Sequence, residues 1–140
     1  MPIQPVGAQG IRGELILNPA FIEGLKDLDG FSHIYLIYFF HKSEGYHLQV
    51  PPFLDDELHG VFATRAPRRP NQIGLSLVKL IAIQDEILIL EDVDMLDGTP
   101  VLDIKPYVPI FEQKEVYRIG WLAGNEEKVR TKRSDGRFNE

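Results

Sequence analysis

Residues 75–93 read LSLVKLIAIQDEILILEDV. Two runs rich in leucine, isoleucine and valine, 75–83 and 87–93, flank the polar segment 84–86. Apolar β-rich runs joined by a short polar turn are typical of a β-hairpin. We therefore expect an antiparallel hairpin here and build the rest of the fold outward from it.

Further strands are predicted on both sides of this hairpin. Residues 33–40, HIYLIYFF, contain no breaker and predict a strand covered on both faces. A polar, proline-containing loop is expected over residues 41–59. Shorter strands are expected at four other places: 13–17, 60–64, 101–104 and 116–121.

One short helix is predicted near the N-terminus. Asn18 can cap a helix, Pro19 tolerates the first helical position and Gly30 is a natural stop. Four apolar residues fall on one helical face: Phe21, Ile22, Leu25 and Leu28. The pattern as a whole favours a mostly-β fold, a small β-barrel with one short N-terminal helix and a polar C-terminal tail. We expect the barrel domain over residues 1–123 and a charged tail over residues 124–140.

Composition narrows the classes of protein. The chain has 140 residues, 44% hydrophobic and 26% charged, which is typical of a single globular domain. The absence of cysteine excludes disulfides, thiol catalysis and cysteine-bound zinc, and it favours a cytoplasmic protein. The longest apolar run, 34–40, is far shorter than the ~18 residues of a membrane helix, so no membrane partner is expected. The four histidines form no cluster, so no metal is expected.

The charges are segregated along the chain. A net charge of −6 argues against a general nucleic-acid binder. Residues 58–84, however, contain no carboxylate and carry three arginines and a lysine, and residues 128–133 add four more cations. A basic strip on an acidic protein can still bind a polyanion locally.

A stiffened arginine loop lies between two predicted strands. Residues 60–75 read GVFATRAPRRPNQIGL, with three arginines within five residues and prolines at positions 67 and 70. The prolines restrict the backbone, and guanidinium groups suit phosphate or carboxylate recognition. The alternative interpretation is a solvated surface loop. In that case the two prolines that restrict its backbone would have no structural role.

A second segment, residues 96–107, reads LDGTPVLDIKPY. A tight turn at Asp97 and Gly98 would present a carboxylate, a hydroxyl and backbone groups to a small polar ligand. The spacing alone is equally typical of an ordinary turn. His41 ends the most apolar strand, which is a common place for a site, although a structural histidine is the alternative.

The arginine loop, residues 60–75, and the segment 96–107 resemble the signatures of the TsaA-like family, the TrmO-type tRNA methyltransferases. Residues 30–41, GFSHIYLIYFFH, resemble the family's central strand, and residues 2–4, PIQ, resemble its N-terminal Pro-x-Gln. The similarity covers residues 2–109. It implies a β-barrel homodimer that binds S-adenosylmethionine and methylates N6 of threonylcarbamoyladenosine at position 37 of tRNA. The partner implied is therefore the tRNA anticodon loop.

The cofactor contacts follow from the resemblance, while the catalytic and tRNA contacts are our own candidates. Asp97 is the candidate catalytic base, although its carboxylate is also a cofactor contact. Family members usually begin with a further strand ahead of Pro-x-Gln, so we expect that this barrel lacks a strand or that the chain starts late. The expected tRNA contacts are Arg68, Arg69 and Lys105. The expected cofactor contacts are Ile3, Gln4, His41, Lys42, Arg65, Leu75, Asp97, Gly98, Thr99 and Pro100.

Two other functions remain open from the residues alone. The first is an S-adenosylmethionine-dependent methyltransferase of another RNA or of a small molecule. The second is a β-barrel that binds a small ligand or RNA through the same basic loop without catalysis. Consumption of S-adenosylmethionine in the presence of tRNA separates an enzyme from a binding protein.

Overall fold

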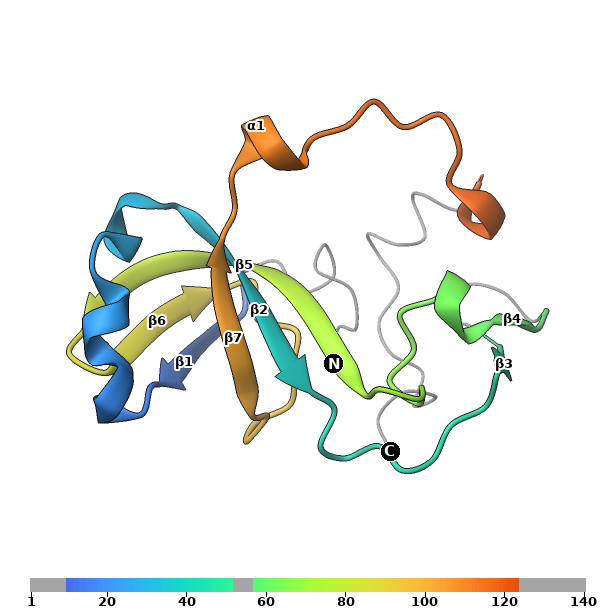
Figure 1. The fold of residues 1–140 in the computed structure, drawn as a ribbon, viewed down its shortest axis with the longest axis horizontal. Helices are drawn as coiled ribbons and strands as arrows, with labels where there is room; N and C mark the ends of the chain where they lie inside the picture. Colours follow the sequence, from blue (N-terminus) through green and yellow to red (C-terminus); the bar gives the residue numbers. More distant parts are fainter. Residues whose placement is uncertain (1–9, 52–56, 124–140) are drawn as a thin grey trace.

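The computed structural model describes residues 10–51 and 57–123, and its main element is an antiparallel five-stranded sheet (Figure 1). Its strands are β1 (Arg12–Ile16), β2 (His33–Phe39), β5 (Ile73–Gln84), β6 (Ile87–Glu91) and β7 (Val101–Pro106). Their order across the sheet is β1-β6-β5-β2-β7, and all neighbours are antiparallel. The hairpin expected from residues 75–93 is confirmed as β5 and β6.

The core lies on one face of this sheet. Alternate side chains of β2 point inward, and Ile34 and Leu36 are fully buried against Val78 of β5 and Leu88 of β6. The side chains on the other face of β2 are half-buried or, at Phe39, exposed. The expectation that this strand is covered on both faces is therefore wrong for the described part of the chain.

The sheet has two open edges. Strands β1 and β7 end the strand order and do not pair with each other, so the described residues form an open sheet where a closed barrel was expected. The mostly-β class is confirmed. Two short 3-10 helices, η2 (Pro19–Leu25) and η3 (Leu28–Gly30), connect β1 to β2, and η3 contacts β5. Residues of β1, η2 and β7 line a groove of about 640 Å³ between the edges.

The predicted N-terminal helix is a pair of 3-10 turns. The Asn18 side chain accepts a hydrogen bond from the Ala20 amide at 3.0 Å, which confirms the predicted cap. Asp27 adopts φ 70° and separates the two turns, because this left-handed backbone cannot continue a right-handed helix. Of the four apolar residues on the predicted helical face, Leu25 and Leu28 pack against the core, while Phe21 and Ile22 are exposed.

A smaller unit lies to the right of the sheet in Figure 1. It contains β3 (Gln49–Val50), β4 (His59–Gly60) and the 3-10 turn η4 (Val61–Ala63). The prediction of a strand over residues 60–64 is wrong except at Gly60, because β4 ends there and the η4 turn follows. The Thr64 hydroxyl donates to the Val61 carbonyl at 2.9 Å and closes the turn, while Val61 itself is buried.

The C-terminal part of the described chain leaves the sheet after β7. It forms α1 (Pro109–Glu112) and η5 (Gly120–Leu122) and reaches the smaller unit (Figure 1). The strand expected for residues 116–121 is wrong. The Trp121 indole instead donates to the Ala63 carbonyl at 2.8 Å, and its ring stacks on His59 with centroids 4.9 Å apart. The predicted charged tail, 124–140, lies outside the described residues. No helix in the described ranges is long and apolar enough to span a membrane.

Candidate functional site at the end of strand β2

Two loops that are far apart in the sequence are attached to the C-terminal end of β2. The amide of Phe39 donates to the Pro100 carbonyl at 3.0 Å, and the amide of Phe40 donates to the Gln72 carbonyl at 2.8 Å. The turn at residues 97–100 therefore flanks this strand end on one side, and the arginine loop flanks it on the other. His41 and Lys42 follow directly, so three of the sequence motifs meet at one place.

The turn at residues 97–100 is tightly closed. Both the amide and the hydroxyl of Thr99 donate to the Leu96 carbonyl, at 3.2 and 2.5 Å. Gly98 has φ +81°, a conformation that favours glycine, and a Cβ there would lie 3.8 Å from Nε2 of His41. The imidazole is therefore beside the turn. Asp97 is exposed, so its carboxylate is open to a ligand.

The arginine loop is held together from within. Nη1 of Arg69 donates to the carbonyls of Thr64 and Ala66, at 3.0 and 3.2 Å. Ala66 is buried, Arg68 and Arg69 are half-buried, and Arg65 is exposed. Arg69 was predicted to contact tRNA phosphates, and the structure gives it a second role as the residue that fixes the loop.

The structure brings most of the predicted site residues together. Leu75 lies on the outer face of the sheet and is 46% exposed. It pairs with Ile37, two residues before the end of β2. Ile3 and Gln4 lie outside the described residues. Arg65 lies close enough to Tyr38 and Asp94 to act on their charges. The predicted cofactor contacts among the described residues thus gather around the end of β2: His41, Lys42, Arg65, Leu75, Asp97, Gly98, Thr99 and Pro100.

Lys105 is the predicted residue that stands apart. It lies opposite Tyr35 in the β2–β7 pairing, six residues before His41, which is about 20 Å along a strand. Its ammonium pairs with the Asp103 carboxylate at 2.9 Å, and both side chains are exposed. A tRNA contact at Lys105 would therefore be separate from the cluster around His41.

A buried polar network behind the site was missed by the sequence analysis. The Ser76 hydroxyl donates its one proton to Oδ1 of Asp94 at 2.6 Å. The Tyr38 hydroxyl, 2.9 Å away, is therefore the donor in its hydrogen bond with the Ser76 oxygen. Ser76 is 1% exposed. Ser76 is the one polar residue among the buried positions of β5, and this is the signal that could have revealed the network.

Burial and charge shift the pKa values of this network. Burial, assisted by the negative charge of Asp94, raises the pKa of Tyr38 to about 12. Burial also raises the pKa of Asp94, while the Ser76 hydrogen bond and the nearby positive charge of Arg65 oppose that shift. The network joins β2 and β5 to the segment that leads into the 97–100 turn, so it positions that turn.

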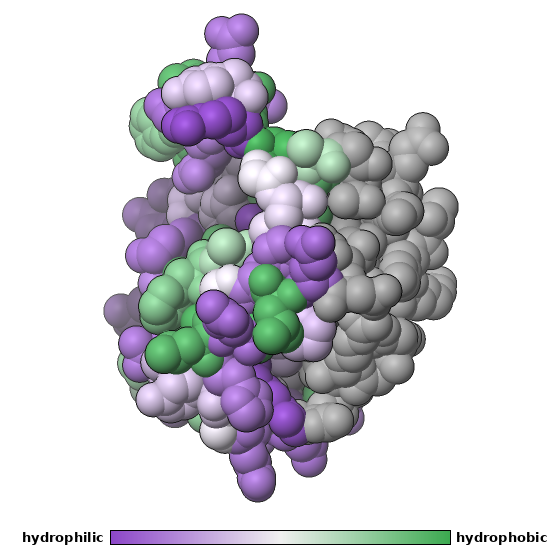
Figure 2. All heavy atoms as spheres, turned by 90° about the vertical axis from the view of Figure 1, so that its right-hand side faces the viewer, coloured by the Kyte–Doolittle hydropathy of each residue, from purple (hydrophilic) through white to green (hydrophobic). Residues whose placement is uncertain are grey.

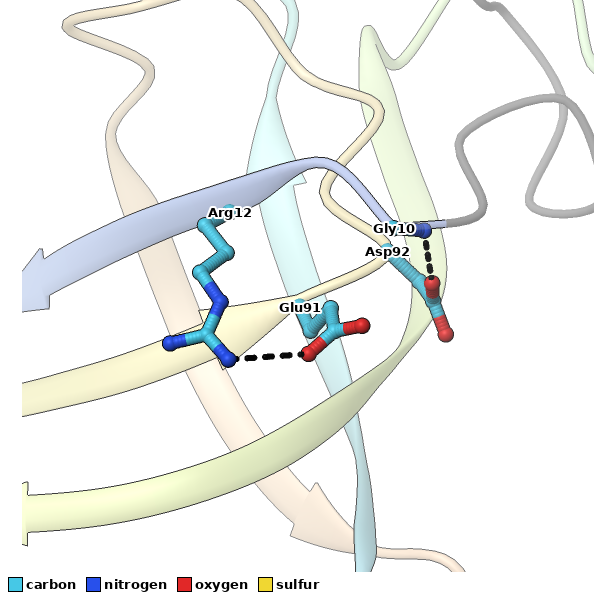
Figure 3. A network of polar contacts seen from close by, with 4 residues as sticks. All are labelled: Gly10, Arg12, Glu91 and Asp92. Carbon is cyan, nitrogen blue, oxygen red and sulfur yellow. Dashed lines mark hydrogen bonds and ion pairs between the residues drawn. The ribbon is translucent and has the colours of Figure 1, made fainter.

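The start of the described chain is tied to the same segment. The Gly10 amide donates to Oδ1 of Asp92 at 2.7 Å, and the Arg12 guanidinium lies 3.5 Å from the Glu91 carboxylate (Figure 3). Asp92 is two residues before Asp94. The described chain therefore begins beside the loop that carries the 97–100 turn.

The donor set of this cluster fits S-adenosylmethionine. That molecule carries a carboxylate, an ammonium group, ribose hydroxyls and an adenine base. Arg65 and Lys42 are the residues that would hold its carboxylate, and Asp97 is the one that would accept from its ammonium or hydroxyl groups. His41 and the backbone of the turn supply further donors and acceptors.

The fold and site thus define a class: a small antiparallel-sheet protein whose polar ligand site is built by loops at one strand end. The chain belongs to the tRNA-methyltransferase O family, whose N-terminal domain model matches residues 1–113. The resemblance stated from the motifs is confirmed.

Named relatives and solved structures agree with this assignment. The chain is 54% identical over 138 residues to a probable S-adenosyl-L-methionine-binding protein of Pyrococcus abyssi, covering 99% of this chain and 75% of that protein. It is 44% identical over 108 residues to a mouse tRNA (adenine(37)-N6)-methyltransferase, covering 75% of this chain and 25% of the relative. The crystal structure of TrmO from Pseudomonas aeruginosa matches with a TM-score of 0.70 and 43% identity, over 86% of this chain and 53% of that one. The chain thus spans about half of that solved protein and a quarter of the mouse enzyme.

Proposed function

We propose that this chain transfers a methyl group from S-adenosylmethionine to N6 of threonylcarbamoyladenosine at position 37 of tRNA. The observation that carries the proposal is the meeting of the His41 strand end, the arginine loop and the 97–100 turn at one site. Membership of the tRNA-methyltransferase O family supports it, because named relatives are tRNA (adenine(37)-N6)-methyltransferases and S-adenosylmethionine-binding proteins.

The reaction requires that the methyl donor and N6 of the base are oriented toward each other and that one proton is removed from N6. S-adenosylmethionine supplies an electrophilic methyl group on its sulfonium, and the thioether is the leaving group. The N6–CH₃ bond forms as the CH₃–S bond breaks, and the N6 proton passes to a base. The carbamoyl group of the substrate makes that N–H more acidic, so a weak base suffices. Asp97 is the proposed base, since its carboxylate is exposed on the turn beside His41.

The arginine loop is proposed to bind the anticodon loop. Arg68 and Arg69 are the proposed phosphate contacts, with Arg69 also holding the backbone that presents Arg65 and Arg68. Arg65 is the proposed partner of a carboxylate of cofactor or substrate. Lys105 would contact tRNA only at a distance from this cluster.

We also propose that the protein is a cytoplasmic homodimer. Large apolar side chains remain exposed on the outer face of the sheet and on α1, among them Phe39, Ile73, Ile110 and Phe111. A second copy would cover such residues. Light scattering should then give twice the chain mass of 16.0 kDa, and a monomer at working concentration would contradict the dimer.

Mass spectrometry of tRNA nucleosides tests the activity. Purified protein with S-adenosylmethionine should convert threonylcarbamoyladenosine at position 37 to its N6-methyl form and leave tRNA that lacks the threonylcarbamoyl group unchanged. The Asp97→Asn variant is the matched control, because it keeps the size of the side chain and removes the base. Methylation of another RNA or of a free nucleoside would favour the alternative acceptor, and no consumption of S-adenosylmethionine would favour a binding protein.

A further inference from the structure

We propose that Phe62 stacks on an unpaired base of the RNA substrate, which rests on the proposed function that tRNA is bound. Phe62 is 77% exposed at the centre of the η4 turn, three residues before Arg65. With so much of its surface exposed, Phe62 gains little from packing against the described residues. Its exposed ring is, however, suited to contact a flat ligand.

The η4 turn is anchored on both sides of Phe62. Val61 is 1% exposed, and its amide donates to the Leu48 carbonyl at 2.8 Å. The carbonyl of Ala63 accepts from Trp121 at 2.8 Å, and the Thr64 hydroxyl bonds back to Val61 at 2.9 Å. The backbone under Phe62 is therefore fixed, so binding at the ring orders little further chain.

The surroundings of the ring favour RNA over other partners. Arg65 is exposed nearby, and the whole segment 58–84 lacks a carboxylate. Aromatic rings combined with cations are the usual means of binding single-stranded RNA, because bases stack on the ring while the cations meet phosphates. Figure 2 looks onto the side of the molecule where η4 lies and shows hydrophobic residues set among polar ones there.

The known strength of base–aromatic stacking sets the expected change in RNA affinity. By alanine substitution in other systems, a stacked base contributes enough to change a dissociation constant about 5- to 150-fold. We therefore expect Phe62→Ala to weaken binding of a tRNA anticodon stem–loop by that factor. The Phe62→Trp variant keeps a stacking surface and should bind within about twofold of the unchanged chain.

The experiment uses fluorescence anisotropy with the full chain and an anticodon stem–loop that carries threonylcarbamoyladenosine. Phe21→Ala is the matched control, because Phe21 is 64% exposed on η2, at the far side of the sheet from η4 in Figure 1, and it should not change RNA affinity. The dependence of log Kd on log salt should stay the same in Phe62→Ala, since no phosphate contact is lost. Calorimetry should show unchanged affinity for S-adenosylmethionine.

Three results would overturn the proposal. Equal RNA affinity of Phe62→Ala and the unchanged chain would refute stacking while leaving the methyltransferase function intact. Loss of the dimer mass in Phe62→Ala would show that a second copy of the chain covers the ring. Absence of RNA binding by the unchanged chain would remove both this proposal and the proposed tRNA substrate.

Discussion

Gly74 is the position where the structure makes the sharpest stability prediction. It lies opposite Tyr38 in the β2–β5 pairing, and the ring of Tyr38 lies over it. A Cβ added at position 74 would be 2.5 and 2.6 Å from two ring carbons of Tyr38 and 2.8 Å from Cζ of Phe40. Real Cβ contacts are essentially never below 3.0 Å, so the Tyr38 ring has to move.

The Tyr38 ring has little freedom to move. Its hydroxyl is bonded to Ser76 at 2.9 Å inside the core, and its edge contacts Phe40 with ring centroids 5.4 Å apart. Where the added methyl group meets no other atom, replacing a strand glycine by alanine stabilises a protein by about 0.5–1 kcal/mol. Overpacking costs about 1–3 kcal/mol, and a weakened buried hydrogen bond adds about 1 kcal/mol. The net expectation for Gly74→Ala is a loss of about 1–3 kcal/mol in the free energy of unfolding.

Urea unfolding followed by circular dichroism measures this loss. Gly60→Ala is the matched control, because Gly60 is also a strand glycine and its added Cβ would meet no atom within 4 Å. In a Tyr38→Ala background the penalty at position 74 should largely disappear, since the two closest contacts are gone and the Phe40 ring, which packs against Tyr38, can move into the space that is left. Gly74→Ala that is as stable as the unchanged chain, or a penalty that persists without Tyr38, would refute the reasoning.

Three further predictions concern the site. Burial raises the pKa of Asp94, so the stability linked to this group is full below its unfolded pKa and is lost as the pH rises through its folded pKa. Asp94→Asn cannot ionise at this position. The free energy of unfolding of this variant minus that of the unchanged chain should therefore increase as the pH rises above about 4, the ordinary pKa of an aspartate, and a constant difference in urea titrations would contradict this. Arg65→Ala should weaken S-adenosylmethionine binding about 10-fold or more by calorimetry, as expected for a charge-assisted hydrogen bond. Arg69→Ala should lower the free energy of unfolding by about 1–3 kcal/mol, because two backbone carbonyls lose their donor; unchanged thermal stability would show that the loop does not depend on it.

Local patterns were sufficient where neighbours in sequence are also neighbours in space. The hairpin of β5 and β6 was predictable because its two runs and its turn are contiguous. The Asn18 cap and the turn at Gly98 depend on a few adjacent residues in the same way. The strands expected at 60–64 and 116–121 were wrong because distant partners decide those segments, with Trp121 bonding to Ala63 across 58 positions.

The sequence by itself determined the mostly-β class, the hairpin and the motifs that carry the family assignment, because these are properties of contiguous residues. Only the tertiary structure decided which motifs meet at the end of β2, and that Arg69 bonds to its own loop while Arg65 stays exposed. It also decided that Ser76 and Asp94 form one buried network, since strand register and the path of the loops place them together. Such contacts depend on packing between segments, and a single sequence read along its length carries no direct record of them.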